Sequence, residues 1–320
     1  MMDWTDVHCR QFHRLLSPHA RLYTEMLTAA AVIHGNREHL LAFDAAQHPL
    51  ALQLGGSEPR ELAEAARIAE GFGYDEINLN VGCPSDRVQS GRFGACLMLE
   101  PSRVAACVAA MQRAVQVPVT VKCRLGVDEQ CEDQALEGLV RPLLEVGLSV
   151  LTVHARKAWL KGLSPRENRT VPPLNYERVY RLKHDWPQLV VILNGGIDSI
   201  EAVDGHLQHV DGVMLGRAAY HQPWILAELD SHLYGTPLPG REQVLEQMRP
   251  WIESQLARGV PLKHIVRHML GVYHAQPGGR RFRRCLAEGA HKPGADWAVL
   301  ERAIAATRPR TPATSSAHVA

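Results

Sequence analysis

A regular alternation of short apolar runs with helical patterns constrains the fold more than any other feature of this sequence. Segments with helical periodicity, such as Glu58–Phe72 and Pro101–Val115, separate runs that have the length of strands. Strands that alternate with helices predict a parallel sheet, and runs that are apolar almost throughout predict a sheet covered on both faces. The predicted strands are Arg21–Thr28, Leu50–Gly55, Glu76–Val81, Val117–Arg124, Leu148–Ala155, Leu189–Gly195 and Gly212–Gly216.

This spacing favours an α/β fold, a TIM (β/α)8 barrel with one strand hidden or missing, because nearly every run ends in polar residues or glycine. A doubly wound sheet is the competing architecture, but no GxGxxG sequence follows an early strand. After Tyr234 the sequence is helical, over Gln243–Leu256, Lys263–His274, Arg280–Ala290 and Asp296–Ala306. We predict a barrel domain over residues 1–234, an all-helical domain over residues 235–306 and a disordered tail over residues 307–320.

The overall composition narrows the class of protein. The formal net charge is only +1, so a nucleic-acid partner would have to be met by a local basic patch. The seven cysteines are odd in number and include no CxxC pair, which favours free thiols in a reducing compartment. No run approaches the roughly 18 apolar residues of a membrane span, and the first residues lack a signal-peptide core. We expect a soluble, cytoplasmic protein.

Polar residues and glycines stand at the ends of the predicted strands, where barrel enzymes build their active sites. Taken alone, a histidine such as His154 is more often a hydrogen-bonded surface or core residue than a catalyst. Lys122, taken alone, could be a solvated lysine that follows a buried strand. Several potential donors that face one mouth are harder to explain in this way. The strand-end residues are Gln53, Asn80, Cys83, Lys122, Arg124, His154, Arg156, Asn194, Gly195, Gly196, Gly216 and Arg217.

The last two predicted strands end in NGG and LGR, where backbone N–H groups can approach an anion closely. Barrels usually bind phosphate at the loops after their last two strands, and Arg217 adds a guanidinium suited to phosphate. No HExxH sequence or carboxylate–histidine cluster indicates a metal. An organic phosphate is more natural, with Lys122 either as a Schiff-base lysine for pyridoxal phosphate or as a cation beside flavin mononucleotide (FMN). The residues alone leave both cofactors open.

The stretch EINLNVGCPSDRVQSGRFGACLM, from Glu76 to Met98, joins a buried strand to a glycine-containing loop with two thiols, Cys83 and Cys96. A structural turn with two inert buried cysteines is the simpler interpretation, because free cysteine usually behaves as a small buried hydrophobic residue. The alternative is that the strand end and its loop place polar groups at the mouth of the barrel.

This stretch and six others resemble the tRNA-dihydrouridine synthases, specifically the DusA subfamily. The others are MMDWTD, ALQLGG, PVTVKCRLG, VHARKAWLKGLSPRENR, ILNGGI and GVMLGRAAY. The resemblance runs over almost the whole chain. It implies an FMN-containing TIM barrel followed by a helical tRNA-binding domain. It also implies the reduction of D-loop uridines at tRNA positions 20 and 20a to 5,6-dihydrouridine, with NADPH recharging the flavin.

The resemblance assigns roles to individual residues. Cys96 is the implied general acid that protonates C5 of uracil while flavin N5 delivers hydride to C6, and a thiol of pKa ~8.5 is still protonated at pH 7. Cys83 is then a structural neighbour. Asn80 and Phe93 stand where the family meets the flipped uridine, which leaves its stack at a cost of a few kcal/mol. The implied FMN contacts are Met1, Met2, Gln53, Lys122, His154, Asn194, Gly195, Gly196, Gly216 and Arg217.

Two basic groups predict a tRNA surface on this nearly neutral chain. The first group follows the predicted strand Leu148–Ala155 and contains Arg156, Lys157, Lys161, Arg166 and Arg169, with Trp159 among them. The second group contains Arg280, Arg281, Arg283 and Arg284, interleaved with Phe282 and followed by His291 and Lys292. For a single run of arginines, a solvated helix face is an equally good explanation. The predicted tRNA contacts are Arg156, Lys157, Asn168, Arg169, Arg281 and Arg284.

One departure from the family and two rival functions complete the expectations. Family members carry a short apolar strand before the motif that starts here at Met1-Met2. We expect that strand to be the one missing from the barrel, and a short N-terminal extension to raise FMN occupancy. The rivals are another FMN barrel that reduces a small pyrimidine, like dihydroorotate dehydrogenase, and an inactive RNA-binding barrel. We predict a monomer without a protein partner.

Overall fold

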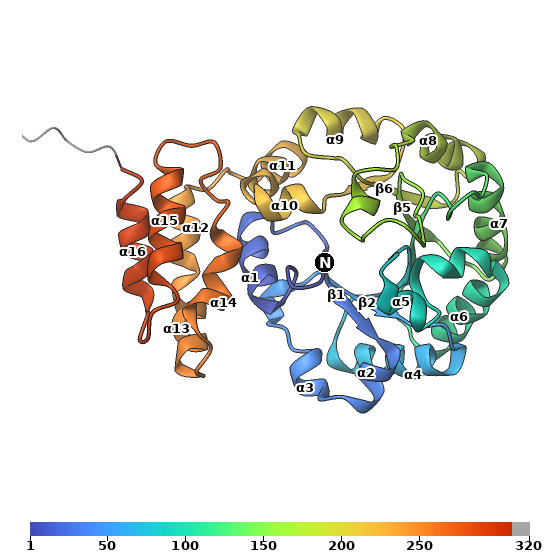
Figure 1. Ribbon diagram of the computed structural model, residues 1–320, viewed down its shortest axis with the longest axis horizontal. Coiled ribbons are helices and arrows are strands. Elements are labelled where there is room, and N and C mark those ends of the chain that lie inside the picture. The colour runs from blue at the N-terminus through green and yellow to red at the C-terminus, as the bar shows by residue number, and fades with distance from the viewer. Residues whose placement is uncertain (309–320) are drawn as a thin grey trace, which may run out of the picture.

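The computed structural model describes residues 1–308, and a curled parallel sheet surrounded by helices occupies most of them (Figure 1). The sheet has seven strands in chain order. The predicted tail lies outside the described residues from position 309 onward. The strands are β1 (Leu22–Thr28), β2 (Leu50–Gly55), β3 (Glu76–Val81), β4 (Val119–Arg124), β5 (Val150–His154), β6 (Val190–Asn194) and β7 (Gly212–Met214).

All seven predicted strands are confirmed, with ends that differ by two residues at most. The chain-order arrangement excludes the doubly wound alternative, in which the strand order reverses at a switch point. A curled parallel sheet with its helices outside is the arrangement of a TIM-type barrel. Within residues 1–308, no strand pairs with both β7 and β1. The first residues lie there instead: the N–H of Asp3 donates to Glu25 of β1, and a Cβ on Gly216 would lie 3.8 Å from Met1 Sδ (Figure 1).

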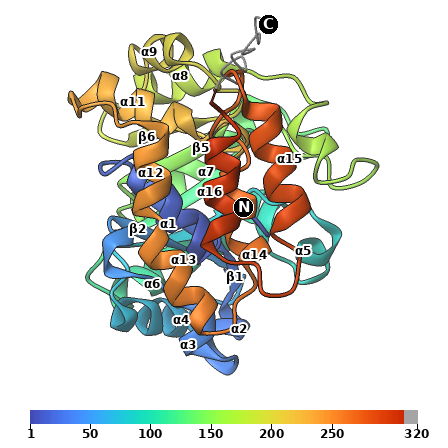
Figure 2. The same ribbon diagram turned by 90° about the vertical axis from the view of Figure 1, so that its left-hand side faces the viewer.

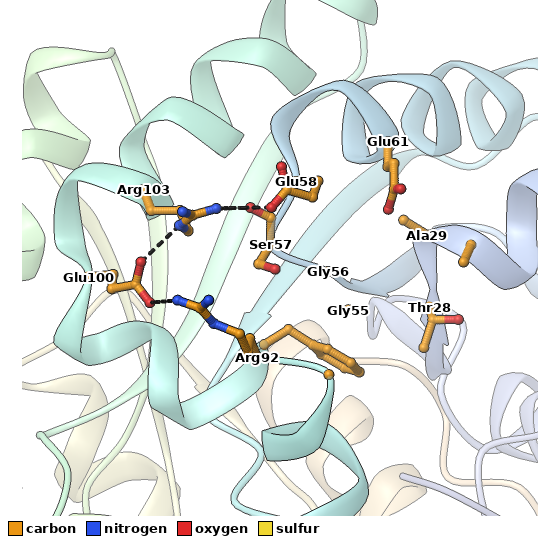
Figure 3. A pocket seen from close by; sticks show the side chains of 13 residues that line it. Thr28, Ala29, Gly55, Gly56, Ser57, Glu58, Glu61, Arg92, Glu100 and Arg103 are labelled. Carbon is orange, nitrogen blue, oxygen red and sulfur yellow. Dashed lines mark hydrogen bonds and ion pairs between the residues drawn. The ribbon is translucent and has the colours of Figure 1, made fainter.

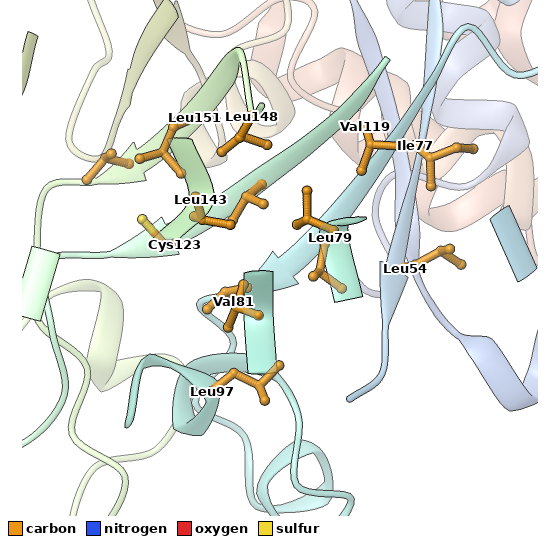
Figure 4. Close-up of a cluster of buried hydrophobic side chains, with 14 of the residues drawn as sticks. Leu54, Ile77, Leu79, Val81, Leu97, Val119, Cys123, Leu143, Leu148 and Leu151 are labelled. Atoms are coloured by element: carbon orange, nitrogen blue, oxygen red, sulfur yellow. The ribbon is translucent and has the colours of Figure 1, made fainter. Parts of the chain in front are cut away.

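Strand β3 shows why both faces of this sheet are buried. Ile77, Leu79 and Val81 point outward into a cluster of apolar side chains between the strands and the surrounding helices (Figure 4). The alternate residues Asn78 and Asn80 face the inside of the ring, because successive side chains of a strand point to opposite faces. The strand therefore uses its outer face for the core and its inner face for polar contacts.

Helices on the outer side of the ring connect successive strands (Figure 1). In α4 (Pro59–Phe72), proline occupies the first turn and Gly73 ends the helix in the left-handed conformation, with φ 96°. Its apolar stripe includes Leu62 and Ala66, which are fully buried. The other helices are α2 (Ala29–His34), α3 (Arg37–Leu40), α5 (Asp86–Ser90), α6 (Pro101–Ala114), α7 (Glu132–Glu145), α8 (Tyr176–Asp185), α9 (Ile200–Leu207), α10 (Arg217–His221) and α11 (Trp224–Tyr234), with 3₁₀ helices η1 (Ala45–Gln47), η2 (Gly94–Leu99) and η3 (Glu167–Arg169).

The C-terminal helices form a second body beside the ring (Figure 1), and they face the viewer in Figure 2. The expected helical character is confirmed, since residues 235–308 contain no strand. The predicted helical stretch 243–256 is divided at Met248, because Pro250 has no N–H to continue the first helix. The elements are α12 (Arg241–Gln247), α13 (Arg249–Ala257), α14 (Leu262–Val266), η4 (Arg267–Met269), α15 (Gly279–Gly289) and α16 (Trp297–Ala305). None of the helices in residues 1–308 is long and apolar enough to span a membrane.

The core of this second body also includes residues from the first 234. Phe12 and Leu16 come from α1 (Val7–Leu16), a helix that the strand–helix pattern does not reveal. Trp224 and Ala227 of α11 belong to the same apolar cluster. The C-terminal helices therefore complete their core against α1 and α11, and the boundary at residue 234 stays a prediction.

Asp6 links the start of α1 to the C-terminal helices. Its carboxylate accepts from the backbone N–H groups of His8 and Cys9 at 3.0 and 2.9 Å. It also lies 2.6 Å from Arg267 Nη2 and 3.0 Å from His268 Nε2. Burial alone raises the pKa of the Asp6 carboxyl, but these donors, with His268 foremost, more than offset burial and hold the pKa below its usual range.

We predict that Asp6→Asn lowers the free energy of unfolding by about 2 kcal/mol at pH 7, because the half-buried ion pair with Arg267 is lost while the amide can still cap the helix. Because the folded-state pKa of Asp6 lies below its unfolded value, this difference is present above about pH 4 and decreases as the pH falls further. Urea unfolding between pH 3 and 7 measures it. Glu253→Gln, which breaks an exposed pair with Arg249, is the control and should cost under about 0.5 kcal/mol.

Candidate active site

The loop after β3 brings two thiols to the carboxyl end of the sheet. Asn80 Oδ1 accepts from the backbone N–H groups of Gly82 and Cys83, at 3.0 and 2.9 Å, which turns the chain as the strand ends. Gly94 has φ 73°, and a Cβ there would lie 2.6 Å from the carbonyl oxygen of Cys83. The N–H of Ala95 donates to that same carbonyl at 2.9 Å. The loop is therefore folded back on its own start, with Cys96 next in the chain.

Cys96 is a half-buried thiol in η2, and its environment keeps it protonated. Its Sγ donates to the carbonyl oxygen of Phe93 at 3.1 Å. Burial raises the pKa of the Cys96 thiol, and the carboxylate of Glu100 raises it further. Cys83 Sγ lies 3.6 Å from Ser85 Oγ in the same loop. At neutral pH Cys96 can therefore donate a proton.

Cations gather at the carboxyl ends of β4 and β5. Arg124 pairs in register with His154, which pairs in turn with Asn194 of β6. Lys122 lies one pleat below and beside Asn80. Burial, followed by the charge of Arg124, lowers the pKa of Lys122 to about 8. The same two causes lower the pKa of His154 well below its usual value, so its imidazole is neutral at pH 7.

Within residues 1–308, no carboxylate forms an ion pair with Lys122, Arg124 or His154. The charges that act most strongly on Lys122 and His154 are those of arginines, including Arg124 and Arg169. Arg124 donates from Nε to the carbonyl of Gly82 and from Nη1 to the carbonyls of Lys157 and Asn168, and burial lowers its pKa to about 10. Cations buried without anions favour the binding of an anionic group. This donor set fits the phosphate and carbonyl oxygens of an organic phosphate cofactor.

The glycines at the end of β6 are required by geometry. Gly195 and Gly196 have φ of 115° and 73°. A Cβ on Gly195 would lie 2.5 Å from Cδ2 of His154, and a Cβ on Gly196 would lie 2.6 Å from Tyr176 Oη. Asn194 Nδ2 donates to the carbonyl of Met214 at 2.6 Å and so fixes the corner of β6 against β7. The NGG sequence therefore forms a corner that lies directly against His154.

The remaining predicted cofactor residues surround the same end of the sheet. Gln53 is half-buried on the inner face of β2 and contacts Asn78 and Asn80. Gly216 precedes α10, and Arg217, which is exposed, donates to the carbonyl of Arg169 at 3.1 Å. Met1 is half-buried beside Gly216, while Met2 is 58% exposed. The structure thus brings Met1 to the predicted site and leaves the side chain of Met2 in solvent.

Three of the predicted tRNA contacts in the loop after β5 hold the loop itself. Arg156 is buried and donates to the carbonyl of Pro172. Lys157 Nζ donates to the carbonyl of Asp128 at 2.7 Å. Asn168 is fully buried and exchanges hydrogen bonds with the backbone of Trp159 at 2.7 and 2.9 Å. In this loop Lys161, Arg166 and Arg169 are the exposed cations.

The other predicted substrate residues differ in exposure. Phe93 is buried, and its ring lies against the backbone of Gly55. Phe282 is fully buried in the second core and is not a surface aromatic among the arginines, because it lies on the apolar face of α15. Arg281 donates to the carbonyl of Arg308 at 3.2 Å, and Arg284 pairs with Glu288 at 2.7 Å. The arginines of α15 at positions 280, 281, 283 and 284 are exposed, as predicted.

A cavity of about 430 Å³ lies between α2, α4, α6 and residues 91–93 of the Cys96 loop (Figure 3). Its wall carries charges of both signs that pair with one another. Arg103 contacts Glu58 at 3.0 Å and Glu100 at 2.8 Å, and Arg92 lies 3.5 Å from Glu100. Because its charges are paired, this cavity lacks the uncompensated positive charge of the strand ends.

We predict that Gly195→Ala lowers the free energy of unfolding by about 1–3 kcal/mol, since alanine disfavours φ 115° and its Cβ would displace the His154 ring. Urea unfolding measures this, and a shift in the imidazole NMR signals would report the displacement. Gly138→Ala is the matched control, because a Cβ there meets nothing within 4 Å inside α7, and it should stabilise by about 0.5–1 kcal/mol. Equal effects of the two substitutions would contradict the packing described.

Residues 1–308 match the family described as "Dihydrouridine synthase (Dus)". A protein of Xanthomonas campestris pv. campestris named tRNA-dihydrouridine(20/20a) synthase is 61% identical over 303 residues, 95% of this chain and 90% of the relative. Proteins with the same name are 55% identical in Vibrio cholerae serotype O1, over 95% of this chain and 94% of the relative, and 53% identical in Yersinia pestis, over 97% and 90%.

Proposed function

The chain belongs to the dihydrouridine synthase family, and from this premise we propose that it reduces uridines 20 and 20a of tRNA to 5,6-dihydrouridine. It is an oxidoreductase by family. We further propose FMN as the bound cofactor and NADPH as the reductant. The observation that carries this proposal is the combination, at one end of the sheet, of a protonated thiol with two cations, the half-buried Lys122 and the buried Arg124, that form no ion pair with a carboxylate of residues 1–308. Because tRNA is the substrate, we place the reaction in the cytoplasm, with the protein acting as a monomer.

The strand-end cations and glycine corners are the groups that would hold FMN. Asn194, Gly195, Gly196, Gly216 and Arg217 would surround its phosphate. The proposed ring contacts are Gln53, Lys122, His154, Met1 and Met2. A neutral His154 imidazole can donate one hydrogen bond and accept another, while Lys122 supplies positive charge. When bound, the flavin supplies the hydride that C6 of uracil accepts.

Cys96 provides the proton that completes the reduction. Hydride addition at C6 leaves negative charge on C5 and the neighbouring C4 carbonyl of the uracil. The Cys96 S–H bond breaks and a C5–H bond forms, which leaves a thiolate that takes a proton from water. The raised pKa of Cys96 keeps the thiol protonated before the reaction, and it favours reprotonation of the thiolate afterwards.

The proposed tRNA surface combines the exposed cations of the β5 loop with those of α15. Arg169 and the exposed α15 arginines, among them Arg281 and Arg284, would contact phosphates. Arg156, Lys157 and Asn168 would act on the tRNA by shaping the loop, since their own donors are engaged within it. Asn80 and Phe93 would meet the extruded uridine, and we propose residues 235–306 as the tRNA-binding domain.

The activity itself is tested with purified protein, NADPH and tRNA that lacks modifications. Mass mapping of the product should find dihydrouridine at positions 20 and 20a. Reduction of free uridine or another small pyrimidine, with none in tRNA, would contradict the proposal and favour the small-molecule alternative.

We predict that Cys96→Ala lowers the rate of dihydrouridine formation by about 10²–10⁴-fold, the usual contribution of a general acid. FMN content and tRNA affinity should stay within about twofold of wild type. Single-turnover measurement of uridine reduction in flavin-loaded protein separates the rate of the chemical step from FMN content and tRNA affinity. Cys83→Ala, in the same loop, is the matched control and should keep most of the activity. The opposite result for the two cysteines would move the acid to Cys83.

We predict that FMN affinity depends on the charge of Lys122. Because its pKa in the free protein is about 8 and a bound anion favours the charged form, wild-type affinity should be constant below pH 8 and fall above it. Phosphate monoesters have their second pKa near 6, so the ligand keeps its charge across this range. Fluorescence titration of cofactor-free protein at pH 7 to 9 measures the trend. Lys122→Met should bind FMN more weakly and remove the pH dependence, whereas Lys263→Met, at an exposed position of α14, should change neither.

A further inference from the structure

Polar side chains inside the ring form a continuous hydrogen-bonded chain beneath the proposed site. Glu76, Asn78, Thr120 and Asn80 are at most 9% exposed, and Gln53 is half-buried. The interior of a TIM barrel is normally filled by branched apolar side chains, and buried polar groups are costly unless each is paired. Polar residues on three neighbouring strands therefore call for an explanation.

The chain crosses from β4 to β3 and β2 and then returns to β3. Thr120 Oγ1 donates to Glu76 Oε1 at 2.6 Å, and Asn78 Nδ2 donates to Thr120 Oγ1 at 2.8 Å. Gln53 Nε2 donates to Asn78 Oδ1 at 2.8 Å, and Asn80 Nδ2 donates to Gln53 Oε1 at 2.8 Å. Strand register makes Gln53, Asn78 and Thr120 direct neighbours. Every donor points toward Glu76.

The Glu76 end dictates this direction. Its carboxylate pairs with Arg21 Nη1 at 2.7 Å and accepts from the hydroxyl of Tyr23 at 2.8 Å. An ionised carboxylate accepts hydrogen bonds and cannot donate them, so the single hydroxyl proton of Thr120 must point to Glu76. Thr120 then offers only a lone pair to Asn78, which must present its NH₂ group.

The other end dictates the same direction independently. The backbone N–H groups of Gly82 and Cys83 can only donate, and both reach Asn80 Oδ1. Asn80 must therefore present its NH₂ group to Gln53. Amide orientations are usually ambiguous, but here two fixed ends require one orientation for all three amides between them. Gln53 Nε2 and Asn80 Nδ2 each keep a second N–H that no atom of residues 1–308 accepts.

We propose that Glu76 and Thr120 are positioning residues that orient Gln53 and Asn80 so that both offer N–H donors to carbonyl or ring-nitrogen acceptors of the flavin and uracil. Asn80 at the same time holds the Gly82–Cys83 corner from which the Cys96 loop begins. Neither positioning residue contacts the reacting atoms. The inference rests on the proposed function, which supplies the acceptors.

Replacing Glu76 or Thr120 should allow the hydrogen bonds of this chain to adopt the opposite donor–acceptor order. In Glu76→Gln the new amide can donate to Thr120, whose proton can then turn to Asn78. Asn78 and Gln53 would rotate in turn and place an NH₂ group against Asn80. That arrangement conflicts with the N–H groups of Gly82 and Cys83, so two directions would compete. Thr120→Val breaks the chain without changing side-chain size.

The matched variants are Thr120→Ser, which keeps the hydroxyl, and Thr152→Val on β5. Thr152 is buried like Thr120, but its hydroxyl has no hydrogen-bond partner within residues 1–308, so the same substitution removes no bond there. Residue-resolved hydrogen exchange of the whole protein reports on the hydrogen-bonded side chains, and it needs no cofactor. Glu76→Gln and Thr120→Val should speed exchange of the Gly82 and Cys83 amides about tenfold or more. Thr120→Ser and Thr152→Val should leave it within about twofold.

The second readout is FMN bound to the full chain. Glu76→Gln and Thr120→Val should weaken FMN binding about tenfold and shift the absorption bands of the bound flavin, and Thr120→Ser should restore both. Unchanged exchange and unchanged FMN binding in Thr120→Val would overturn the inference, as would equal effects of Thr152→Val. Faster exchange in Thr120→Val, together with a wild-type protein that binds no flavin, would support the oriented chain and overturn the proposed function instead.

Discussion

The burial of positive charge without carboxylate partners, at the carboxyl ends of β4 and β5, is the constraint on which the rest of the site depends. Isolated buried cations are costly, and each one here is relieved differently. Lys122 has a lowered pKa, His154 is neutral, and Arg124 donates to three backbone carbonyls. None of these solutions supplies negative charge. A ligand with a fixed negative charge would therefore be stabilised at this end of the sheet.

Two electrostatic environments lie close together around this constraint. The cations of β4 and β5 suit an anion, whereas Cys96 lies in a loop where burial and Glu100 keep its thiol neutral. A thiol placed directly among the cations would be ionised to a greater extent at pH 7, and the ionised fraction would have no proton to donate. Strand β3 contributes to both environments. Its apolar face packs on the helices (Figure 4), its amides face the ring, and the Cys96 loop begins at its end. One strand thus joins the core, the oriented amides and the acid.

The fold and the strand-end groups could be predicted from the sequence because they follow from local periodicity. Carboxyl ends of parallel strands meet at one edge, so Lys122, His154 and Gly195 were predicted together without knowledge of their contacts. The partners of Arg156 and Lys157 could not be predicted, since they are backbone carbonyls from other loops. Phe282 was misassigned to the surface because a run of arginines does not reveal which face of its helix is apolar. Helix α1 was missed because its apolar stripe belongs to the second core.

The most direct test of the central claim compares the affinities of the protein for FMN and riboflavin, which share the flavin ring and differ in the phosphate. Charge-assisted hydrogen bonds contribute about 1.5–3 kcal/mol each, so several at the glycine corners and Arg217 predict that FMN binds at least about 100-fold more tightly. Inorganic phosphate should weaken the binding of FMN and leave that of riboflavin unchanged. Equal affinities for the two flavins would contradict the account, because the glycine corners, Arg217 and the positive charge beside them would then contribute nothing to binding the phosphate.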